Sequence, residues 1–250
     1  MSYVYIVDHP HDEPIYKFTS VGSRVRTCWN VLSKHKRKFI NRRGHYLENG
    51  NPKCASIYFW GEYEAGSDAT LTAWQRPQAI HDYVLPGRGN LPMLTHAHNT
   101  DPYVFGNHFK HICCGMRNKK YNPGDMILFG KLDRNRFTLA LDTVFIVKEE
   151  VQIDNKRNTT QYYKVGIEPL QNKKQHFYRG ISFFDNSNYY CFVPCLLQND
   201  LFSLPLPQID LKALGFTSTA RIQFTNGIWD QVVTEVTKNG WHIGVRIDNV

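Results

Sequence analysis

The chain has 250 residues, of which 42% are hydrophobic and 14% aromatic, and it carries a formal net charge of +8. This apolar content is enough to bury a substantial core, which excludes an intrinsically disordered chain. Six scattered cysteines make no disulfide framework, and neither a signal-peptide pattern nor a transmembrane-length apolar stretch is visible, so we expect a cytoplasmic protein with free thiols.

The first elements are predicted from alternation and from helical spacing. Tyr3 to Val7 alternates aromatic and aliphatic residues, which predicts a strand. Ser23 is placed to cap a helix. The apolar positions that follow it at helical spacing are Val25, Cys28, Trp29 and Leu32. We expect this helix to run through the basic residues after it and to end before Arg43-Gly44.

Positive charge is concentrated in one segment near the N-terminus. Between Pro14 and Leu47 there are nine Lys or Arg residues and no Asp or Glu, so this window carries +9 and the rest of the chain sums to −1. Such a block is typical of a surface that meets nucleic acid, an anionic nucleotide or an anionic surface. A solvated basic helix face is the alternative interpretation. The candidate phosphate-binding residues are Lys34, Lys36, Arg37, Lys38, Arg42 and Arg43.

The first candidate ligand site follows a strand predicted from Ser56 to Glu64. If that strand is regular, Trp60, Glu62 and Glu64 share one face. The indole is then placed to stack on a base while the carboxylates read its edge. Paired carboxylates equally suit Mg²⁺ binding or acid–base catalysis, and an exposed strand end with solvated charges has the same pattern.

A long loop-like segment from Arg76 to Asp101 contains the second candidate site, since long connections in compact domains are often functional. The polar residues Asn99, Thr100 and Asp101 end this loop, and the aromatic residues Tyr103 and Phe105 follow them. Polar residues next to aromatic residues suit a ligand that has a polar edge and a flat ring for stacking. The same polar residues also form ordinary turns.

Histidines and cysteines gather between positions 96 and 114, at His96, His98, His108, His111, Cys113 and Cys114. Zinc sites usually show tighter pairs than these, so surface histidines with buried thiols are the preferred interpretation. We therefore predict no metal and no cofactor.

The segment from Pro123 to Val147 carries a recognisable pattern. It begins with a Pro-Gly-Asp turn, continues as an apolar strand ending at Phe129-Gly130, and returns through a charged turn into a second strand ending at Val147. This order resembles PUA-like β-barrels of the EVE and ASCH type, and it is similar to uncharacterised bacterial and phage proteins associated with nucleotide modification. The resemblance covers about a tenth of the chain. It implies a barrel flanked by helices, a cleft for a nucleobase, and a role in bacterial or phage defence.

The C-terminal half continues with further strands and one helix. Strands are predicted from Gln161 to Ile167 and from Tyr189 to Val193, and the chain closes with a strand from Trp241 to Ile247. Asn226 is placed to cap a helix that Gly240 stops. Arg179, beside aromatic residues and a glycine, is a further candidate for gripping a phosphate.

Together these patterns predict an α+β, mainly β protein: one PUA-like, partly closed barrel domain over residues 1–250 with flanking helices. We expect it to bind nucleic acid or a nucleotide and to have no membrane partner. The more specific form of this hypothesis is recognition of a modified base. One alternative is an enzyme that processes nucleotides or nucleic acid with Glu62, Glu64 and Asp101, assisted by His96 or His98. Another is a protein that senses or sequesters a small nucleotide signal. The oligomeric state is left open.

Overall fold

The structure is a computed structural model that describes residues 1–8, 17–18, 24–25, 38–61, 81–82, 103–105, 108–112, 120–151, 176–198 and 206–248. Within these ranges the protein is built from strands and a single helix, α1 (Asn226–Thr237). The mainly β, α+β class predicted from the sequence is thus confirmed. No helix in the described ranges has the length and apolar character needed to cross a membrane.

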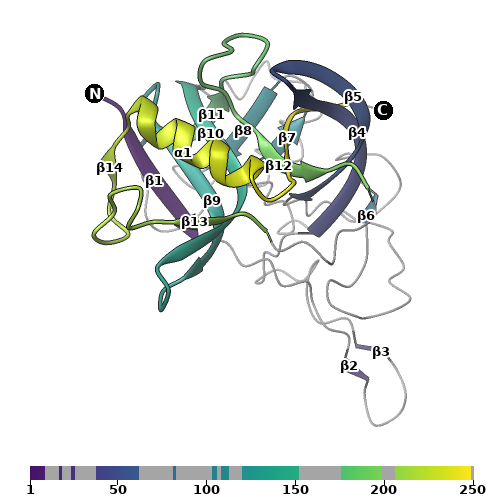
Figure 1. Ribbon diagram of the computed structural model, residues 1–250, viewed down its shortest axis with the longest axis horizontal. Helices are drawn as coiled ribbons and strands as arrows, with labels where there is room; N and C mark the ends of the chain where they lie inside the picture. The colour runs from purple at the N-terminus through teal and green to yellow at the C-terminus, as the bar shows by residue number, and fades with distance from the viewer. Residues whose placement is uncertain are drawn as a thin grey trace, which may run out of the picture.

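The larger sheet has eight strands in the order β14-β1-β9-β10-β11-β8-β7, with β13 paired to β10 (Figure 1). Its strands are β1 (Tyr3–Asp8), β7 (Tyr103–Phe105), β8 (His108–Ile112), β9 (Met126–Asp133), β10 (Thr138–Glu150), β11 (Phe177–Gly180), β13 (Gln208–Asp210) and β14 (Ile222–Gln223). Most of the pairs are antiparallel, and β1 runs parallel to β9. Residues 126–129 of β9 and 144–147 of β10 are almost completely buried, so this central pair forms the middle of the core.

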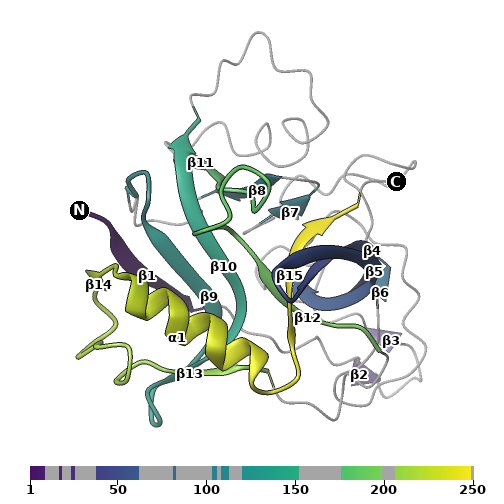
Figure 2. The ribbon, with the colours of Figure 1, turned by 45° about the horizontal axis from the view of Figure 1, so that its top comes forward.

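The smaller sheet closes on itself. Its order is β15-β12-β5-β4-β6, and β15 also pairs with β4. These strands are β4 (Lys38–Glu48), β5 (Asn51–Gly61), β6 (His81–Asp82), β12 (Val193–Leu196) and β15 (His242–Ile247), and a separate two-stranded ribbon joins β2 (Lys17–Phe18) to β3 (Arg24–Val25). Because β4, β5, β12 and β15 pair antiparallel around a full circle, they form a small closed barrel, seen beside the larger sheet in Figures 1 and 2.

The hairpin of β4 and β5 turns at Asn49 and Gly50, which both have positive φ, 50° and 76°. Since Glu48 pairs with Asn51, the loop has two residues, and an Asn-Gly pair suits such a turn because both tolerate left-handed backbone. This turn sets the register of the whole hairpin, which decides which side chains of β4 and β5 face each other.

The Pro-Gly-Asp turn has a structural explanation. Gly124 has a φ of 86°, which glycine adopts without strain. The buried carboxylate of Asp125 accepts hydrogen bonds from the backbone N–H of Asn122 and of Tyr3, at 2.8 Å each. The turn therefore ties β1 to the β9–β10 hairpin, and this hairpin lies in the larger sheet and not in the closed barrel.

Helix α1 crosses one face of the larger sheet, near β13 and β15 (Figures 1 and 2). Its buried side chains are Ile228, Trp229, Val232 and Val236. The indole of Trp229 packs edge-on against the rings of Tyr189 and Tyr190, with centroids 5.6 and 5.2 Å apart. The helix predicted here is confirmed, but the predicted cap is wrong by one residue: Thr225 occupies the N-cap position and Asn226 is the first residue of the helix.

The helix predicted after Ser23 is wrong wherever the structure describes it. Arg24–Val25 is strand β3, and Lys38 through Arg43 lies in strand β4; the residues between 25 and 38 lie outside the described ranges. For residues 38–43 the reason is tertiary, because β4 pairs along its whole length with β5 and this ladder holds them as a strand.

Other strand boundaries also differ from those expected. The strand predicted from Tyr189 to Val193 is displaced: strand β12 runs from Val193 to Leu196 and contains Pro194, and Phe192 forms only an isolated bridge with Val144. Pro194 lies opposite Ile243 of β15 in the barrel register. Strand β5 begins at Asn51, before the predicted Ser56, while the strand predicted from Gln161 to Ile167 falls outside the described residues.

Candidate functional site

A group of polar side chains gathers where the C-terminal end of β15 meets β4. The register pairs Ile247 with Gly44, and the N–H of Asp248 donates to the carbonyl oxygen of Arg43 at 2.9 Å. This bond extends the β15–β4 ladder by one residue. Asp248 therefore sits at a fixed backbone position beside the β4–β5 hairpin.

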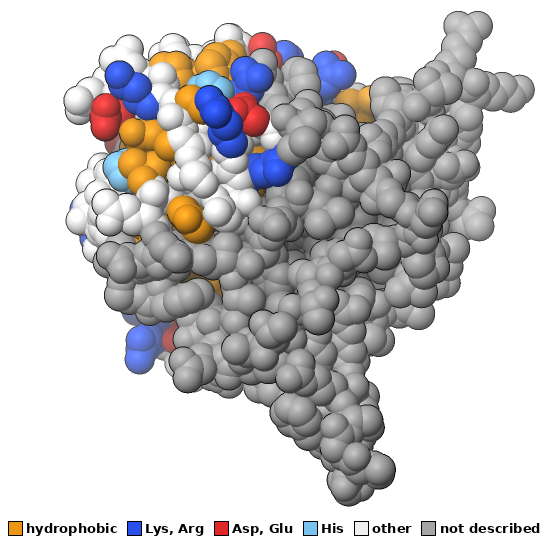
Figure 3. Space-filling view, turned by 90° about the vertical axis from the view of Figure 1, so that its right-hand side faces the viewer, with side chains coloured by type: hydrophobic (Ala, Val, Ile, Leu, Met, Phe, Trp, Pro, Cys, Tyr) orange, Lys and Arg blue, Asp and Glu red, His pale blue; other side chains and the backbone are white. Residues whose placement is uncertain are grey.

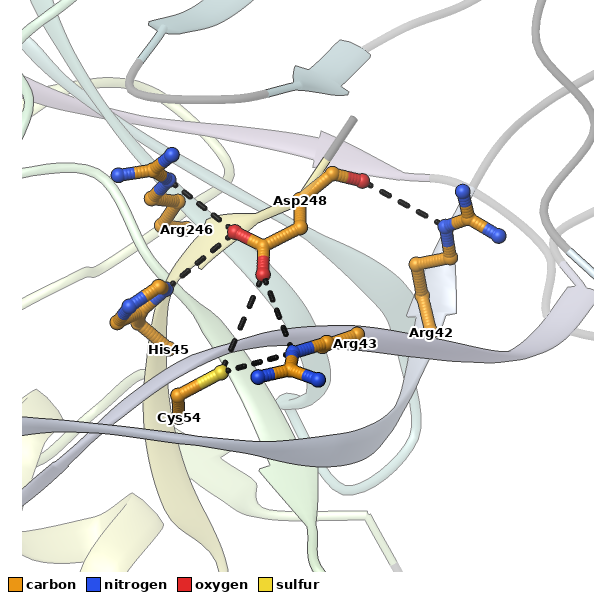
Figure 4. Close-up of polar contacts among 6 residues, drawn as sticks. All are labelled: Arg42, Arg43, His45, Cys54, Arg246 and Asp248. Carbon is orange, nitrogen blue, oxygen red and sulfur yellow. Dashed lines mark hydrogen bonds and ion pairs between the residues drawn. The ribbon is translucent and has the colours of Figure 1, made fainter. Parts of the chain in front are cut away.

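The carboxylate of Asp248 is the centre of this group (Figure 4). Its Oδ1 lies 3.2 Å from Nε of Arg246 and 3.4 Å from Nδ1 of His45, and its Oδ2 lies 3.9 Å from Nε of Arg43. The Sγ of Cys54 is 4.0 Å from Oδ2 and accepts a hydrogen bond from Arg43 Nε at 3.2 Å. We call these five residues the Asp248 cluster.

The strand register explains why three of these side chains meet. His45 lies directly opposite Cys54 in the hairpin, and directly opposed residues project from the same face. Arg43 precedes His45 by two positions and so shares that face. The neighbouring Gly44 and Tyr46 are buried, which places the Asp248 cluster on the outer face of the barrel wall.

Arg42 approaches Asp248 from the other side of β4. Alternation turns it away from the face that carries Arg43, and its Nε donates to the backbone carbonyl of Asp248 at 3.5 Å. The two arginines that the sequence marked as phosphate-binding candidates therefore both contact Asp248, but through different atoms. Figure 4 shows their guanidinium groups pointing in different directions.

The guanidinium groups of Arg43 and Arg246 keep binding capacity. Both use Nε toward Asp248, and among the described residues their terminal nitrogens have no hydrogen-bond partner. The side chain of Arg43 is 77% exposed and that of Arg246 is 38% exposed. The pKa of Arg43 is raised, chiefly by its hydrogen bond to Cys54, so the group is cationic at any physiological pH. A guanidinium held by Nε offers its two terminal nitrogens as a fork for a phosphate or carboxylate.

Burial within the Asp248 cluster is uneven. Nδ1 of His45, Nε of Arg246 and Oδ1 of Asp248 are all covered, and within the described part of the chain none of the three has a hydrogen bond of good geometry. Oδ1 of Asp248 lies 3.2 Å from Nε of Arg246 and 3.4 Å from Nδ1 of His45, without a well-aligned bond to either. Figure 3 shows the described surface on this side of the molecule, where Lys and Arg side chains surround acidic groups and a histidine.

The other predicted site residues are dispersed. Trp60 is 9% exposed and belongs to the core, so little of its ring faces solvent. Tyr103 and Phe105 form the two ends of β7 in the larger sheet. Arg179 lies in β11 of the same sheet and forms an ion pair with Glu149 at 3.0 Å. The ligand-binding role of these residues remains a prediction.

Several predicted residues fall where the structure does not describe the chain. Of the phosphate-binding candidates, Lys38 is described as part of the β4 backbone, while Lys34, Lys36 and Arg37 lie outside the described residues. The same holds for Glu62, Glu64, Asn99, Thr100 and Asp101. Of the histidines and cysteines, His108 and His111 are strand residues of β8, and His96, His98, Cys113 and Cys114 lie outside the described ranges.

Sequence reasoning missed four members of the Asp248 cluster: His45, Cys54, Arg246 and Asp248. One signal was present for the first two, because an Asn-Gly pair predicts a two-residue hairpin turn and places residues 45 and 54 opposite each other. No local pattern indicates Arg246 or Asp248, which reach the site through the β15–β4 pairing.

Comparisons with protein-family models, with curated proteins and with solved structures find no match to this chain.

Proposed function

We propose that the protein binds nucleic acid through the arginines around Asp248 on the outer wall of the barrel. The observation that carries this proposal is the convergence of Arg42, Arg43 and Arg246 on one acidic residue. One carboxylate does not neutralise three guanidinium groups, so the site keeps net positive charge and attracts a polyanion.

The contact chemistry fits a phosphate backbone. Arginine forks bind phosphate oxygens in pairs, and such charge-assisted bonds are stronger than neutral ones. Asp248 holds Arg43 and Arg246 by Nε, which orders these side chains before a ligand arrives. Prior ordering lowers the entropy that binding has to remove.

The charge distribution along the chain favours a long polyanion over a small nucleotide. The window from Pro14 to Leu47 holds nine basic residues and no acidic ones, and its last two basic residues are Arg42 and Arg43 of the site. A polyanion is able to meet more of these charges than a single nucleotide. A sensor of a small nucleotide, the rival proposal, needs only the arginines near Asp248.

We further propose that the protein is related to PUA-like barrel proteins. This relationship is supported by the small, closed, antiparallel barrel of β4, β5, β12 and β15, whereas the Pro123 to Val147 hairpin lies in the larger sheet. The resemblance implies a cleft that accepts a nucleobase, and such a cleft is the feature to seek beside the arginines.

The test is fluorescence anisotropy with labelled single-stranded DNA and RNA of about 20 nucleotides, and with a labelled ATP analogue, over a range of salt concentrations. We expect oligonucleotide affinity to fall steeply with salt and the nucleotide to show a shallower slope. Arg43→Ala and Arg246→Ala should each weaken oligonucleotide binding and reduce the slope of log affinity against log salt concentration by about one. The ATP analogue should bind these variants either more weakly or unchanged.

The matched control is Arg136→Ala. It removes the same charge from an 83% exposed side chain that pairs with Asp133 in the β9–β10 turn of the larger sheet. Thermal melts of all variants check that they are folded. Equal weakening by Arg136→Ala, or no binding of either oligonucleotide at low ionic strength, contradicts the proposal. Preferential binding of the ATP analogue selects the nucleotide sensor instead.

A further inference from the structure

We propose that His45, Cys54 and Asp248 form a binding site for a zinc ion or a similar transition-metal cation. One ligand atom from each residue, an imidazole nitrogen, the thiol sulfur and a carboxylate oxygen, lies within 4.8 Å of the other two. This site shares Asp248 with the arginines proposed to bind phosphate, but it is tested by separate measurements.

Two of the separations between ligand atoms come close to those of a tetrahedral zinc site, one through each oxygen of Asp248. With typical zinc–ligand lengths, neighbouring ligand atoms lie about 3.3 Å apart for nitrogen and oxygen and about 3.5 Å apart when sulfur is one of them. In the structure the His45 Nδ1 and Asp248 Oδ1 atoms are 3.4 Å apart, and Cys54 Sγ lies 4.0 Å from Asp248 Oδ2. Small side-chain rotations suffice to bring the three donors to one ion.

The backbone of the site is already in place. His45 and Cys54 are a directly opposed pair in an eleven-residue hairpin, and the N–H of Asp248 bonds to Arg43 in the next strand position. Three ligands carried on rigid strands bind a metal with little loss of backbone entropy. The covered, poorly hydrogen-bonded Nδ1 of His45 and Oδ1 of Asp248 are the atoms that a cation would satisfy.

The donor set selects the class of metal. Thiolate and imidazole ligands favour zinc and related transition metals, whereas magnesium and calcium favour sites made of oxygen atoms. Three protein ligands leave a fourth position for water or for a phosphate oxygen, as in zinc sites that are open to substrate.

The positive charge of the neighbouring arginines opposes cation binding, and this gives the proposal a further test. Arg43 lies 3.9 Å from the Asp248 carboxylate and 3.2 Å from the Cys54 sulfur, so it competes with a metal for both ligands. Because its side chain is 77% exposed, a metal that displaces Arg43 from these ligands leaves the guanidinium in contact with water. Removing Arg43 should therefore tighten metal binding while it weakens phosphate binding.

The experiment is a Co²⁺ titration of the full-length, metal-free protein under reducing conditions, followed by absorbance and then by displacement with Zn²⁺. Thiolate ligation gives a near-ultraviolet charge-transfer band, and four-coordinate Co²⁺ gives strong visible bands. We expect both in the wild type, loss of the charge-transfer band in Cys54→Ser, and at least tenfold weaker binding in His45→Ala and Asp248→Asn. Arg43→Ala should bind several-fold more tightly than the wild type.

Two results overturn the proposal. One is an unchanged spectrum in Cys54→Ser, which would assign any thiolate ligation to other cysteines of the chain. The other is absence of the bands in both the wild type and Arg43→Ala. Cys54 is exposed, so its replacement by serine should not unfold the protein, and circular dichroism checks this. Neither result bears on oligonucleotide binding, which the anisotropy experiment tests separately.

Discussion

Gly44 faces the interior of the barrel where β4 pairs with β15. A Cβ atom at this position would lie 2.4 Å from the backbone oxygen of Arg246 and 2.8 Å from Cδ1 of Ile57. The first contact is with backbone and yields only if the strands separate. This small residue thus permits the close approach that closes the barrel and brings Arg246 and Asp248 to the site.

Gly44→Ala should lower the free energy of unfolding by about 1–3 kcal/mol, the usual range for overpacking a core. Urea denaturation measures this as a lower midpoint. Gly227→Ala is the matched control: it lies in the first turn of α1, where the nearest atom to a new Cβ is 3.9 Å away, and should stabilise by about 0.5–1 kcal/mol. An unchanged midpoint in Gly44→Ala would show that the barrel tolerates a wider strand separation.

The pKa of His242 is lowered, chiefly by burial, with the charge of Glu48 acting weakly in the opposite direction. An unfolded chain has an ordinary histidine pKa of about 6.5, so it binds a proton here at a higher pH than the folded protein does. Stability contributed by this residue is therefore complete above about pH 7 and is lost as the pH falls through 6.5 toward the lower folded value.

His242→Gln should flatten the fall in the free energy of unfolding between about pH 7 and pH 5.5. Urea titrations of wild type and variant across this range give the difference directly, because the other ten histidines are common to both proteins. Parallel pH profiles for the two proteins would show that the ring is hydrated in the folded state.

At the scale of elements, local signals predicted what local interactions determine. The Pro-Gly-Asp turn, the hairpin after it and helix α1 each carry their own turn or spacing residues, and the structure confirms these elements. Strand β4 carries a misleading helical spacing nearby, and its true conformation depends on pairing with β5 and β15. The Asn49-Gly50 turn is a local signal for the pairing with β5, but the pairing with β15 leaves no trace within a short window of sequence.

The candidate site shows the same division. Arg42 and Arg43 were identified because a run of basic residues is visible in the sequence. Their common partner, Asp248, is separated from Arg42 by 206 positions and from Cys54 by 194. Its role follows from barrel closure, which composition and periodicity do not contain.

Helix α1 depends on its packing more than on its ends. Its N-cap residue, Thr225, makes no side-chain capping bond, and no acidic residue lies in the first turn. Trp229 provides the main contact, against Tyr189, Tyr190 and Phe192. Helical stability in proteins comes mostly from such packing of one face.

Trp229→Ala should therefore cost about 3–5 kcal/mol, as large-to-small changes of buried aromatic residues do. Gln231→Ala, an exposed position of the same helix, should stay within about 0.5 kcal/mol of wild type. Chemical denaturation followed by circular dichroism compares the two. A small effect at Trp229 would mean that the aromatic group holds together without the helix.

At the scale of the whole molecule, an isolated backbone bridge joins the larger sheet to the segment that enters the barrel. Val144 of β10 and Phe192 exchange both of their hydrogen bonds at 2.9 Å, and the chain passes from Phe192 directly into β12 of the barrel. Next to this bridge, the buried Cys191 bonds with its N–H to Ile181 and contacts Ile146 through its sulfur. Neither sheet is able to separate from the other without breaking buried bonds.

The two sheets should consequently unfold as one cooperative unit, as expected for a single domain. We expect native-state hydrogen exchange to give the same opening free energy for amides of β9, such as Ile127 and Leu128, and for amides of β12 and β15, such as Cys195 and Val245. Denaturation followed by tryptophan fluorescence and by circular dichroism should give coincident transitions. A lower opening free energy for amides of β4, β5, β12 and β15 alone would show instead that the barrel opens independently. The arginines around Asp248 would then separate from one another before the rest of the core unfolds.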